Sequence, residues 1–352
     1  MADQPAAFER EFGRRVCVAF GLGPAGLGPA DLQLTPLAAS STRLWALDTG
    51  SGADGGGRFV VKEFPYHDGD RPAEVAAAAE FEYSLWRTGD IVMPEPMRAR
   101  DGQFVTWLTG SRGARVPVRA HRWLDGAPAP EPSSVVVAVA AGRALALIHR
   151  AGAARPARTG GSVRWWPQEH HELIGPMADR GLLTPGEAAT ARDSLGRAEA
   201  FLAAGDQLAG DWIYTHCDHK PANSLLVGAH VAVLDWDECG YCHPRLEVVE
   251  SALRWAGAAV GEPEPDVARA FLRGYEEVTG SKFGRLTVAD FAKWVAAEAG
   301  WFWFTGRRAL GWYKDDTAAE RISAAEMAAW AIETLSRTLA SVDRWAQALS
   351  DA

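Results

Sequence analysis

The chain has 352 residues, of which 47% are hydrophobic and 23% are charged, and this balance excludes a disordered or fibrous protein. Its 36 basic and 45 acidic residues give a net charge of −9, without the broad basic footprint of nucleic-acid binding, so nucleic acid is not an expected partner. At about 150 residues per domain, the length allows two packed lobes or one large domain.

The N-terminal residues and the cysteines indicate where the protein resides. Residues 1–15 mix acidic and basic side chains with few apolar ones, unlike a secretory signal. The longest apolar stretch, Val135–Ile148, is interrupted by Arg143 and is shorter than the ~20 residues of a bilayer span. The four cysteines are too scattered for a disulfide framework. We therefore expect a cytoplasmic protein without a membrane-spanning helix.

The first third of the chain is predicted to be mainly β-sheet, because short β-rich runs alternate with turn residues. It contains four candidate strands: Arg43–Thr49, Arg58–Phe64, Gln103–Leu108 and Val116–Trp123. Residues Pro72–Arg87 are rich in helix formers, begin with proline and end before Gly89, and therefore predict one helix. The proline-rich segment Ala127–Pro132 follows Gly126 and predicts a lobe boundary there.

Beyond this boundary the pattern is helical. The predicted helices are Ser133–His149, Pro185–Ala204, Pro244–Ala258, Asp266–Val278 and a long alanine-rich pair within Val288–Leu349. We therefore expect an α+β protein of two lobes. Residues 1–126 are expected to form a small lobe with a five-stranded antiparallel sheet and one helix, and residues 127–352 a larger helical lobe.

Residues 214–238, YTHCDHKPANSLLVGAHVAVLDWDE, are the most informative stretch of the chain. A polar loop, His216–Asn223, precedes an apolar hairpin, Ser224–Leu234, which leads to an acidic pair at Asp235 and Asp237. Because a hairpin brings its two ends together, polar residues before and after it are expected to meet.

Three side chains of this stretch, Asp218, Asn223 and Asp235, could therefore converge on one spot. Carboxylate and amide oxygens suit a Mg²⁺ ion that keeps several waters and bridges substrate phosphates. A second carboxylate near that ion can accept a proton from a hydroxyl group. The pattern predicts phosphate chemistry at this loop.

The spacing His-x-Asp-x-x-x-x-Asn, followed by an apolar run and Asp, resembles the catalytic loop and metal-binding aspartate of the protein-kinase-like superfamily. The string Leu234–Asp237, LDWD, resembles the aminoglycoside phosphotransferase and choline kinase branch in particular. The resemblance spans about Thr35–Glu250. It implies a bilobal protein-kinase-like fold, with Asp218 as the group that orients and deprotonates the acceptor and Asn223 with Asp235 as Mg²⁺ ligands.

The resemblance also implies a small-lobe lysine that grips the α- and β-phosphates and a helix glutamate that orients it. Lys62, inside the β-rich run Phe59–Phe64, and Lys220, in the polar loop, are two of only five lysines, so their presence at both expected positions favours function over chance. Lys220 is expected to neutralise the γ-phosphate. The orienting glutamate is Glu80 or Glu82, and we expect Glu80, which leaves the neighbouring aromatic residues for packing.

Two further segments are candidates for nucleotide contacts. No glycine-rich loop precedes Lys62; the turn there instead has small residues whose N–H and hydroxyl groups can donate to phosphate, Ser40, Ser41 and Thr42. The strand that runs into the linker supplies the candidate hinge for the base, with the backbone of His121, Arg122, Trp123 and Leu124.

Two other clusters have simpler explanations than a cofactor site. Cys239–His243 matches the C-x-x-C-H pattern of haem attachment, which requires an exported chain. Glu169–Glu172 reads EHHE, but successive helical residues point in different directions. In contrast, Phe302–Arg308, Trp312 and Asp315–Asp316 form an aromatic and charged patch where related kinases bind their acceptor, and favour a polar, sugar-bearing or aminated ligand.

The sequence thus predicts an ATP- and Mg²⁺-dependent phosphotransferase, a monomer or homodimer. It is expected to act on a hydroxyl group of a small-molecule antibiotic or related secondary metabolite, and to confer resistance or self-resistance. GTP could replace ATP as the donor. Two alternatives remain open: a kinase of primary metabolism acting on choline, homoserine or a sugar, and a pseudokinase that binds nucleotide without turnover. The intact set of Lys62, Asp218, Asn223 and Asp235 argues against the pseudokinase.

Overall fold

The chain folds into two compact units. This computed structural model describes residues 4–22, 32–39, 43–50, 57–64, 72–161, 163, 169–313 and 316–350. The first unit extends to Ala129 and also includes Asn223–Gly240, and the second comprises Pro130–Ala222 and the chain from Tyr241 onward. A single boundary near Gly126 was therefore an incomplete prediction. The later segment returns to the first unit because strand β9 (Ser224–Val227) pairs with β6 (Ala127–Pro128).

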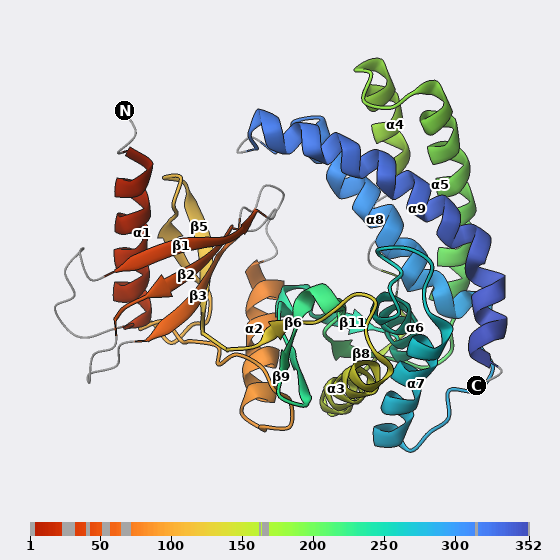
Figure 1. Ribbon diagram of the computed structural model, residues 1–352, viewed down its shortest axis with the longest axis horizontal. Helices are drawn as coiled ribbons and strands as arrows, with labels where there is room; N and C mark the ends of the chain where they lie inside the picture. The colour runs from red at the N-terminus through yellow and green to blue at the C-terminus, as the bar shows by residue number, and fades with distance from the viewer. Residues whose placement is uncertain are drawn as a thin grey trace. The chain divides into compact units, whose positions relative to one another are not determined.

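The first unit is built on a five-stranded antiparallel sheet, as predicted (Figure 1). Its strands in spatial order are β1 (Gln33–Ala39), β2 (Arg43–Asp48), β3 (Arg58–Glu63), β5 (Arg115–Arg122) and β4 (Thr106–Thr109). Strand β1 was not among the four candidates. It contains Pro36 beside a register irregularity, and a proline in a β-rich run is typical of an edge strand.

One face of this sheet is apolar and packs on a helix, α1 (Gln4–Phe20), that the sequence did not predict. The prediction of one helix in this lobe was therefore wrong, since α2 (Pro72–Trp86) is a second. The apolar residues of α1 are sparse, but they recur every four residues and form one buried stripe. The core between α1 and the sheet includes Phe12, Val16, Phe20, Leu47, Val61 and Val118.

The other face of the sheet is charged. Lys62 on β3 lies directly opposite Arg119 on β5, and opposite residues of an antiparallel pair point to the same face. His121, two residues after Arg119, shares that face. The same strands therefore build an apolar core on one side and a row of cationic and imidazole groups on the other.

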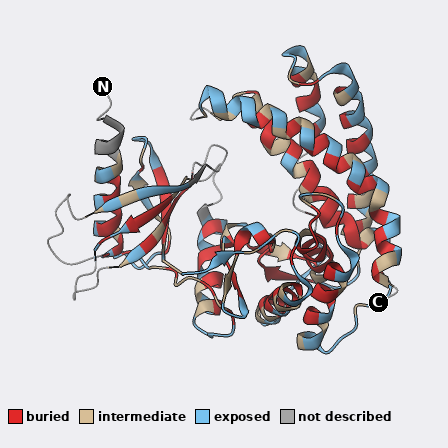
Figure 2. Cartoon of the chain, viewed as in Figure 1, coloured by how far each residue is buried: buried red, intermediate tan, exposed pale blue. Residues whose placement is uncertain are grey.

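The second unit is mainly helical, as predicted. Its helices are α3 (Val135–Ala153), α4 (His170–Asp179), α5 (Pro185–Asp206), α6 (Pro244–Trp255), α7 (Pro265–Thr279), α8 (Ala292–Ala309) and α9 (Ala318–Ser350). A small three-stranded sheet has the strand order β11 (Gly240–Cys242), β8 (Asp211–Thr215), β7 (Arg158–Thr159). The long helices carry one buried and one exposed stripe each, typical of helices around a shared core (Figure 2).

Helix α3 is the most apolar helix of the second unit. By length and composition it could cross a membrane, but half of its most apolar window is buried inside the protein. It packs very closely on α7 at two glycines. A Cβ atom added at Gly142 would lie 2.0 Å from the Phe271 carbonyl oxygen, and one added at Gly274 would lie 2.1 Å from the Val139 carbonyl oxygen. This burial and close packing are typical of a core helix.

Candidate active site

The hairpin after the polar loop places two of the predicted metal ligands at one end. Strand β9 pairs with β10 (His230–Val233), and Ser224 lies opposite Val233. The Leu234 N–H extends the ladder by donating to the Asn223 carbonyl oxygen, at 2.9 Å. Asn223 and Asp235 therefore flank the same end of the hairpin, as expected from the sequence.

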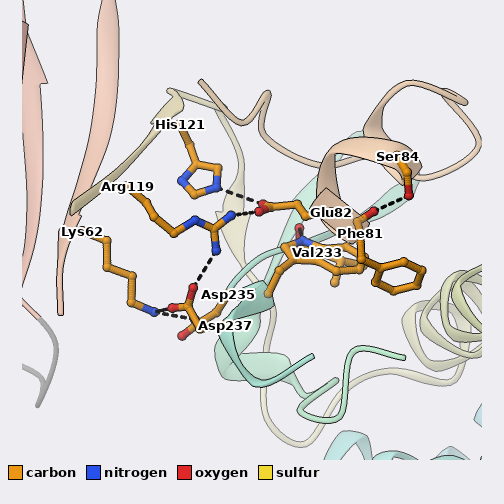
Figure 3. A network of polar contacts seen from close by, with 10 residues as sticks. Lys62, Phe81, Glu82, Ser84, Arg119, His121, Val233, Asp235 and Asp237 are labelled. Atoms are coloured by element: carbon orange, nitrogen blue, oxygen red, sulfur yellow. Dashed lines mark hydrogen bonds and ion pairs between the residues drawn. The ribbon is translucent and has the colours of Figure 1, made fainter. Parts of the chain in front are cut away.

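Lys62 reaches the acidic pair that follows this hairpin (Figure 3). Its Nζ atom lies 2.5 Å from Asp235 Oδ1 and also forms an ion pair with Asp237. Lys62 is only 8% exposed, so the ammonium group is largely removed from water. Residues separated by more than 170 positions thus meet inside the first unit.

The charges of this cluster stabilise one another. Burial alone would lower the pKa of Lys62, but the Asp237 and Asp235 carboxylates outweigh burial and raise it above its ordinary value. Burial would raise the pKa of Asp237, but the charges of Lys62 and Arg119 hold it well below its usual range. Lys62 is therefore cationic and Asp237 anionic at neutral pH.

Arg119 links the acidic pair to helix α2. Its Nη1 atom donates to Asp237 Oδ1 at 2.6 Å, and its Nη2 atom forms an ion pair with Glu82 (Figure 3). His121 Nε2 lies 2.9 Å from the second oxygen of Glu82. Burial, together with the charge of Arg119, lowers the pKa of His121 to about 3, so its ring is neutral and serves as a hydrogen-bond donor to Glu82.

The helix glutamates differ from the prediction. Glu80, the expected partner of Lys62, has a side chain that is 54% exposed and lies 3.5 Å from Arg98. Glu82 is buried at 1% exposure, but it pairs with Arg119 and His121 rather than with Lys62. Residues two apart on a helix point about 200° apart, so only one of the two glutamates can face the sheet. The choice of Glu80 was wrong.

This arrangement predicts unequal effects for two matched substitutions on α2. We expect Glu82→Gln to lower the free energy of unfolding by about 2 to 3 kcal/mol, because it removes one carboxylate from the buried Arg119. Glu80→Gln should change it by less than about 0.5 kcal/mol, because Glu80 is solvent-exposed. Urea denaturation of the two variants measures both values, and equal losses would contradict the buried Glu82–Arg119 pair.

The predicted nucleotide segments have different outcomes. Ser40, Ser41 and Thr42 lie outside the described residues. In the candidate hinge, the N–H groups of Arg122 and Trp123 donate to the carbonyl oxygens of Glu95 and Arg58, both at 2.9 Å.

His121 is paired with strand neighbours on both sides, with Val60 in β3 and with Pro96 in an isolated bridge. The predicted contact of the His121–Leu124 backbone with a nucleotide base stays a prediction. Backbone that is not committed to the sheet begins near Leu124, where β5 has ended.

The second unit carries the polar loop of the predicted catalytic residues. Lys220 Nζ lies 2.8 Å from Asp218 Oδ1, and the Asp218 N–H donates to His216 Nδ1 at 3.2 Å. Burial would raise the pKa of Asp218, but the charge of Lys220 outweighs burial and lowers it. Asp218 is therefore an ionised carboxylate at neutral pH, as a proton acceptor must be.

Both candidate loops contain strained backbone. Cys217, before Asp218, has a φ of 64°, and Asp235 has a φ of 60°. Among the described residues, these are the two non-glycine positions with positive φ. Such conformations are uncommon for residues with a side chain and cluster at functional sites. The strain marks the same two loops that the sequence pattern marks.

Several residues of these networks were not predicted. Arg119 and Glu247 lie in segments without a motif. Glu247, on α6, accepts a hydrogen bond from the Cys217 N–H at 2.6 Å. Burial would raise the pKa of Glu247, but the hydrogen bond from His149 and the charge of Lys293 lower it to about 2. Lys293 is one of the five lysines, so lysine scarcity was a signal that could have identified it.

The donor set at the hairpin fits a magnesium ion. The part of the chain that the structure describes holds no group of three or more His, Cys, Asp or Glu residues arranged for a metal ion. Mg²⁺ is commonly held by only one or two carboxylates, with phosphate oxygens and water completing its coordination. One carboxylate from Asp235 and one amide oxygen from Asn223 are compatible with this mode, whereas they are too few for a permanent all-protein site.

Comparison with known proteins identifies the family. Residues 33–280, most of the chain, match the family described as "Phosphotransferase enzyme family". The chain belongs to this family. Membership confirms the predicted enzyme class, a small-molecule kinase of the aminoglycoside phosphotransferase type. No curated protein matches the chain.

Solved structures share the fold of this family member at low sequence identity. An amicoumacin kinase, in complex with AMP-PNP, Ca²⁺ and its antibiotic, has a TM-score of 0.64 and 14% identity, with 96% of each chain covered. A spectinomycin phosphotransferase, in complex with ADP and spectinomycin, has a TM-score of 0.62 and 11% identity, covering 94% of this chain and 98% of the other. A choline/ethanolamine kinase family protein from Mesorhizobium loti has a TM-score of 0.59 and 16% identity, covering 98% and 100%. Antibiotic and amino-alcohol kinases therefore share this fold.

Proposed function

We propose that the protein transfers the γ-phosphate of ATP to a hydroxyl group of a small-molecule antibiotic or related secondary metabolite, in the presence of Mg²⁺. One observation carries the proposal: a single hairpin end presents Asn223 and Asp235, and the buried Lys62 pairs with Asp235 there. A cation beside oxygen ligands is the arrangement that phosphate binding requires.

Each group has a proposed role in the transfer. Asn223 and Asp235 would hold Mg²⁺, which neutralises phosphate charge when bound. Lys62 grips the α- and β-phosphates. Asp218 orients the acceptor hydroxyl and takes its proton as the oxygen bonds to the γ-phosphorus, and the bond to the departing ADP oxygen breaks. Lys220, paired with Asp218, neutralises the γ-phosphate.

The acceptor is proposed to be an antibiotic because amicoumacin and spectinomycin are bound by the two fold relatives with the highest TM-scores quoted above. A cation of the protein itself already contacts the aromatic patch that the sequence predicted for the acceptor. Arg307 already covers the rings of Trp303 and Trp312, at 4.4 and 4.7 Å from their centroids, so those faces are occupied by a cation of the protein itself.

A kinase of amino alcohols is the second candidate, because the choline/ethanolamine kinase family protein is covered over its full length by this chain. The same catalytic groups would serve either acceptor class. Only the acceptor distinguishes the two functions.

An acceptor panel tests the proposal. The purified protein is incubated with Mg²⁺ and ATP or GTP, and ADP or GDP release is measured with aminoglycosides, peptide and nucleoside antibiotics, choline, ethanolamine, homoserine and sugars. We expect an antibiotic to stimulate ADP release at least about tenfold over the rate without acceptor. Stimulation by an amino alcohol, homoserine or a sugar alone would replace the antibiotic assignment with primary metabolism. Tight nucleotide binding without stimulation by any acceptor would favour a pseudokinase.

A further inference from the structure

A buried lysine lies behind the loop that carries Asp218, and the proposed chemistry does not use it. Lys293, at the start of α8, is 3% exposed. Its Nζ atom donates to the carbonyl oxygen of Cys217 at 2.7 Å and forms an ion pair with Glu250 of α6. A buried ammonium group is costly unless its donors are used. Because this lysine is buried, solubility does not explain why it stands at position 293.

Lys293 contacts the carbonyl group of Cys217, the residue with strained backbone directly before Asp218. Cys217 has a left-handed φ of 64°, and both of its backbone polar groups are held by charged side chains. Its N–H donates to Glu247, and its carbonyl oxygen accepts from Lys293. Strain of this kind persists only where the surrounding structure enforces it. Two helices, α6 and α8, thus hold the two peptide groups on either side of the Cys217 Cα atom.

We propose that Lys293 is a positioning residue for phosphoryl transfer. By holding the Cys217 carbonyl group, it maintains the strained turn and thereby orients the Asp218 carboxylate toward the acceptor hydroxyl. The proposal rests on the proposed function for the role of Asp218. The backbone restraint itself is a property of the loop and can be measured without any substrate.

A purely structural role for Lys293 is the alternative, in which it only neutralises Glu250. The single variant Lys293→Met does not separate the two roles, because it leaves the buried Glu250 carboxylate with only Arg254, at 3.6 Å. The double variant K293M/E250Q removes both charges and keeps similar side-chain sizes. It restores charge balance but not the hydrogen bond to Cys217, so it isolates the positioning role.

The experiment compares the wild type with K293M, K293M/E250Q and the control K282M, whose lysine is 84% exposed and pairs with Glu276. Three properties are measured: the unfolding temperature, hydrogen exchange of the amides of residues 214–220, and kcat and KM with the best acceptor of the panel. We expect the double variant to unfold near the wild-type temperature. Its Cys217 and Asp218 amides should exchange about tenfold faster, kcat should fall about tenfold or more, and KM for ATP should change less than about threefold.

Wild-type exchange rates and kcat in a folded K293M/E250Q variant would overturn the proposal and leave Lys293 as the partner of Glu250. Faster exchange with unchanged kcat would overturn the orienting role. If the wild type phosphorylates no acceptor, the proposed function fails, and the exchange measurement still decides whether Lys293 restrains the loop. K282M should match the wild type in all three measurements.

Discussion

Replacement of Asp218 by asparagine is expected to lower acceptor-dependent ADP release by about 10³-fold, with little change in fold. The amide keeps the size of the side chain but cannot accept the hydroxyl proton, and general base catalysis typically contributes 10²- to 10⁴-fold. Lys220 retains a polar neighbour at 2.8 Å, so the loop should remain folded. The measurement is kcat in a coupled ADP assay, with AMP-PNP affinity determined by calorimetry.

The matched control for this variant is Asp193→Asn, an aspartate on α5 whose side chain is 71% exposed. It should leave kcat and the unfolding temperature unchanged. If Asp218→Asn retains more than about a tenth of wild-type turnover, Asp218 is not the group that accepts the proton. A large loss of AMP-PNP affinity would instead indicate that Asp218 acts in nucleotide binding.

Two substitutions at the hairpin should separate metal binding from phosphate binding. Asp235→Asn is expected to abolish the Mg²⁺ dependence of AMP-PNP binding and lower kcat by about 10³-fold, because it removes the carboxylate proposed to hold the ion. Lys62→Met should weaken AMP-PNP binding about tenfold or more both with and without Mg²⁺, because a phosphate contact is lost. Calorimetry with and without Mg²⁺ measures these four affinities.

The folds of both variants should survive because the acidic cluster has more than one cation. In Asp235→Asn, Lys62 still pairs with Asp237, and in Lys62→Met, Asp237 still pairs with Arg119. Circular dichroism and the unfolding temperature verify this. Undiminished Mg²⁺-dependent binding in Asp235→Asn would exclude Asp235 as a metal ligand, and wild-type affinity in Lys62→Met would exclude its phosphate contact.

Much of the fold follows from local patterns in the sequence. Helices α2 and α5 begin at the prolines that predicted them, because proline is favoured in the first turn of a helix. Strand β3 and the loop from His216 to Asn223 were located by β-rich composition and motif spacing. Helix α1 was missed because its few apolar residues become a pattern only when the sheet that covers them is known.

The partners of the charged residues did not follow from such patterns. Glu80 and Glu82 have the same chemistry and lie on the same helix, and only the packing of α2 on the sheet shows which one is buried. Arg119 had no motif, yet it is the residue that pairs with Glu82 and leaves Lys62 to the two aspartates. A cation on β3 and another on β5 compete for the same acids once the strands align them.

The amino-acid sequence alone determined the chemistry available to this protein, since the spacing from His216 to Asp235 and the scarcity of lysine are properties of the chain itself. Turn, hairpin and helix preferences act over a few residues, so they also placed these groups on their local elements. Only the tertiary structure decided which charges meet, as when Lys293 contacts the Cys217 carbonyl group 76 residues away. Such contacts depend on which face of each helix is buried and on the packing of distant segments, and short-range preferences do not encode either.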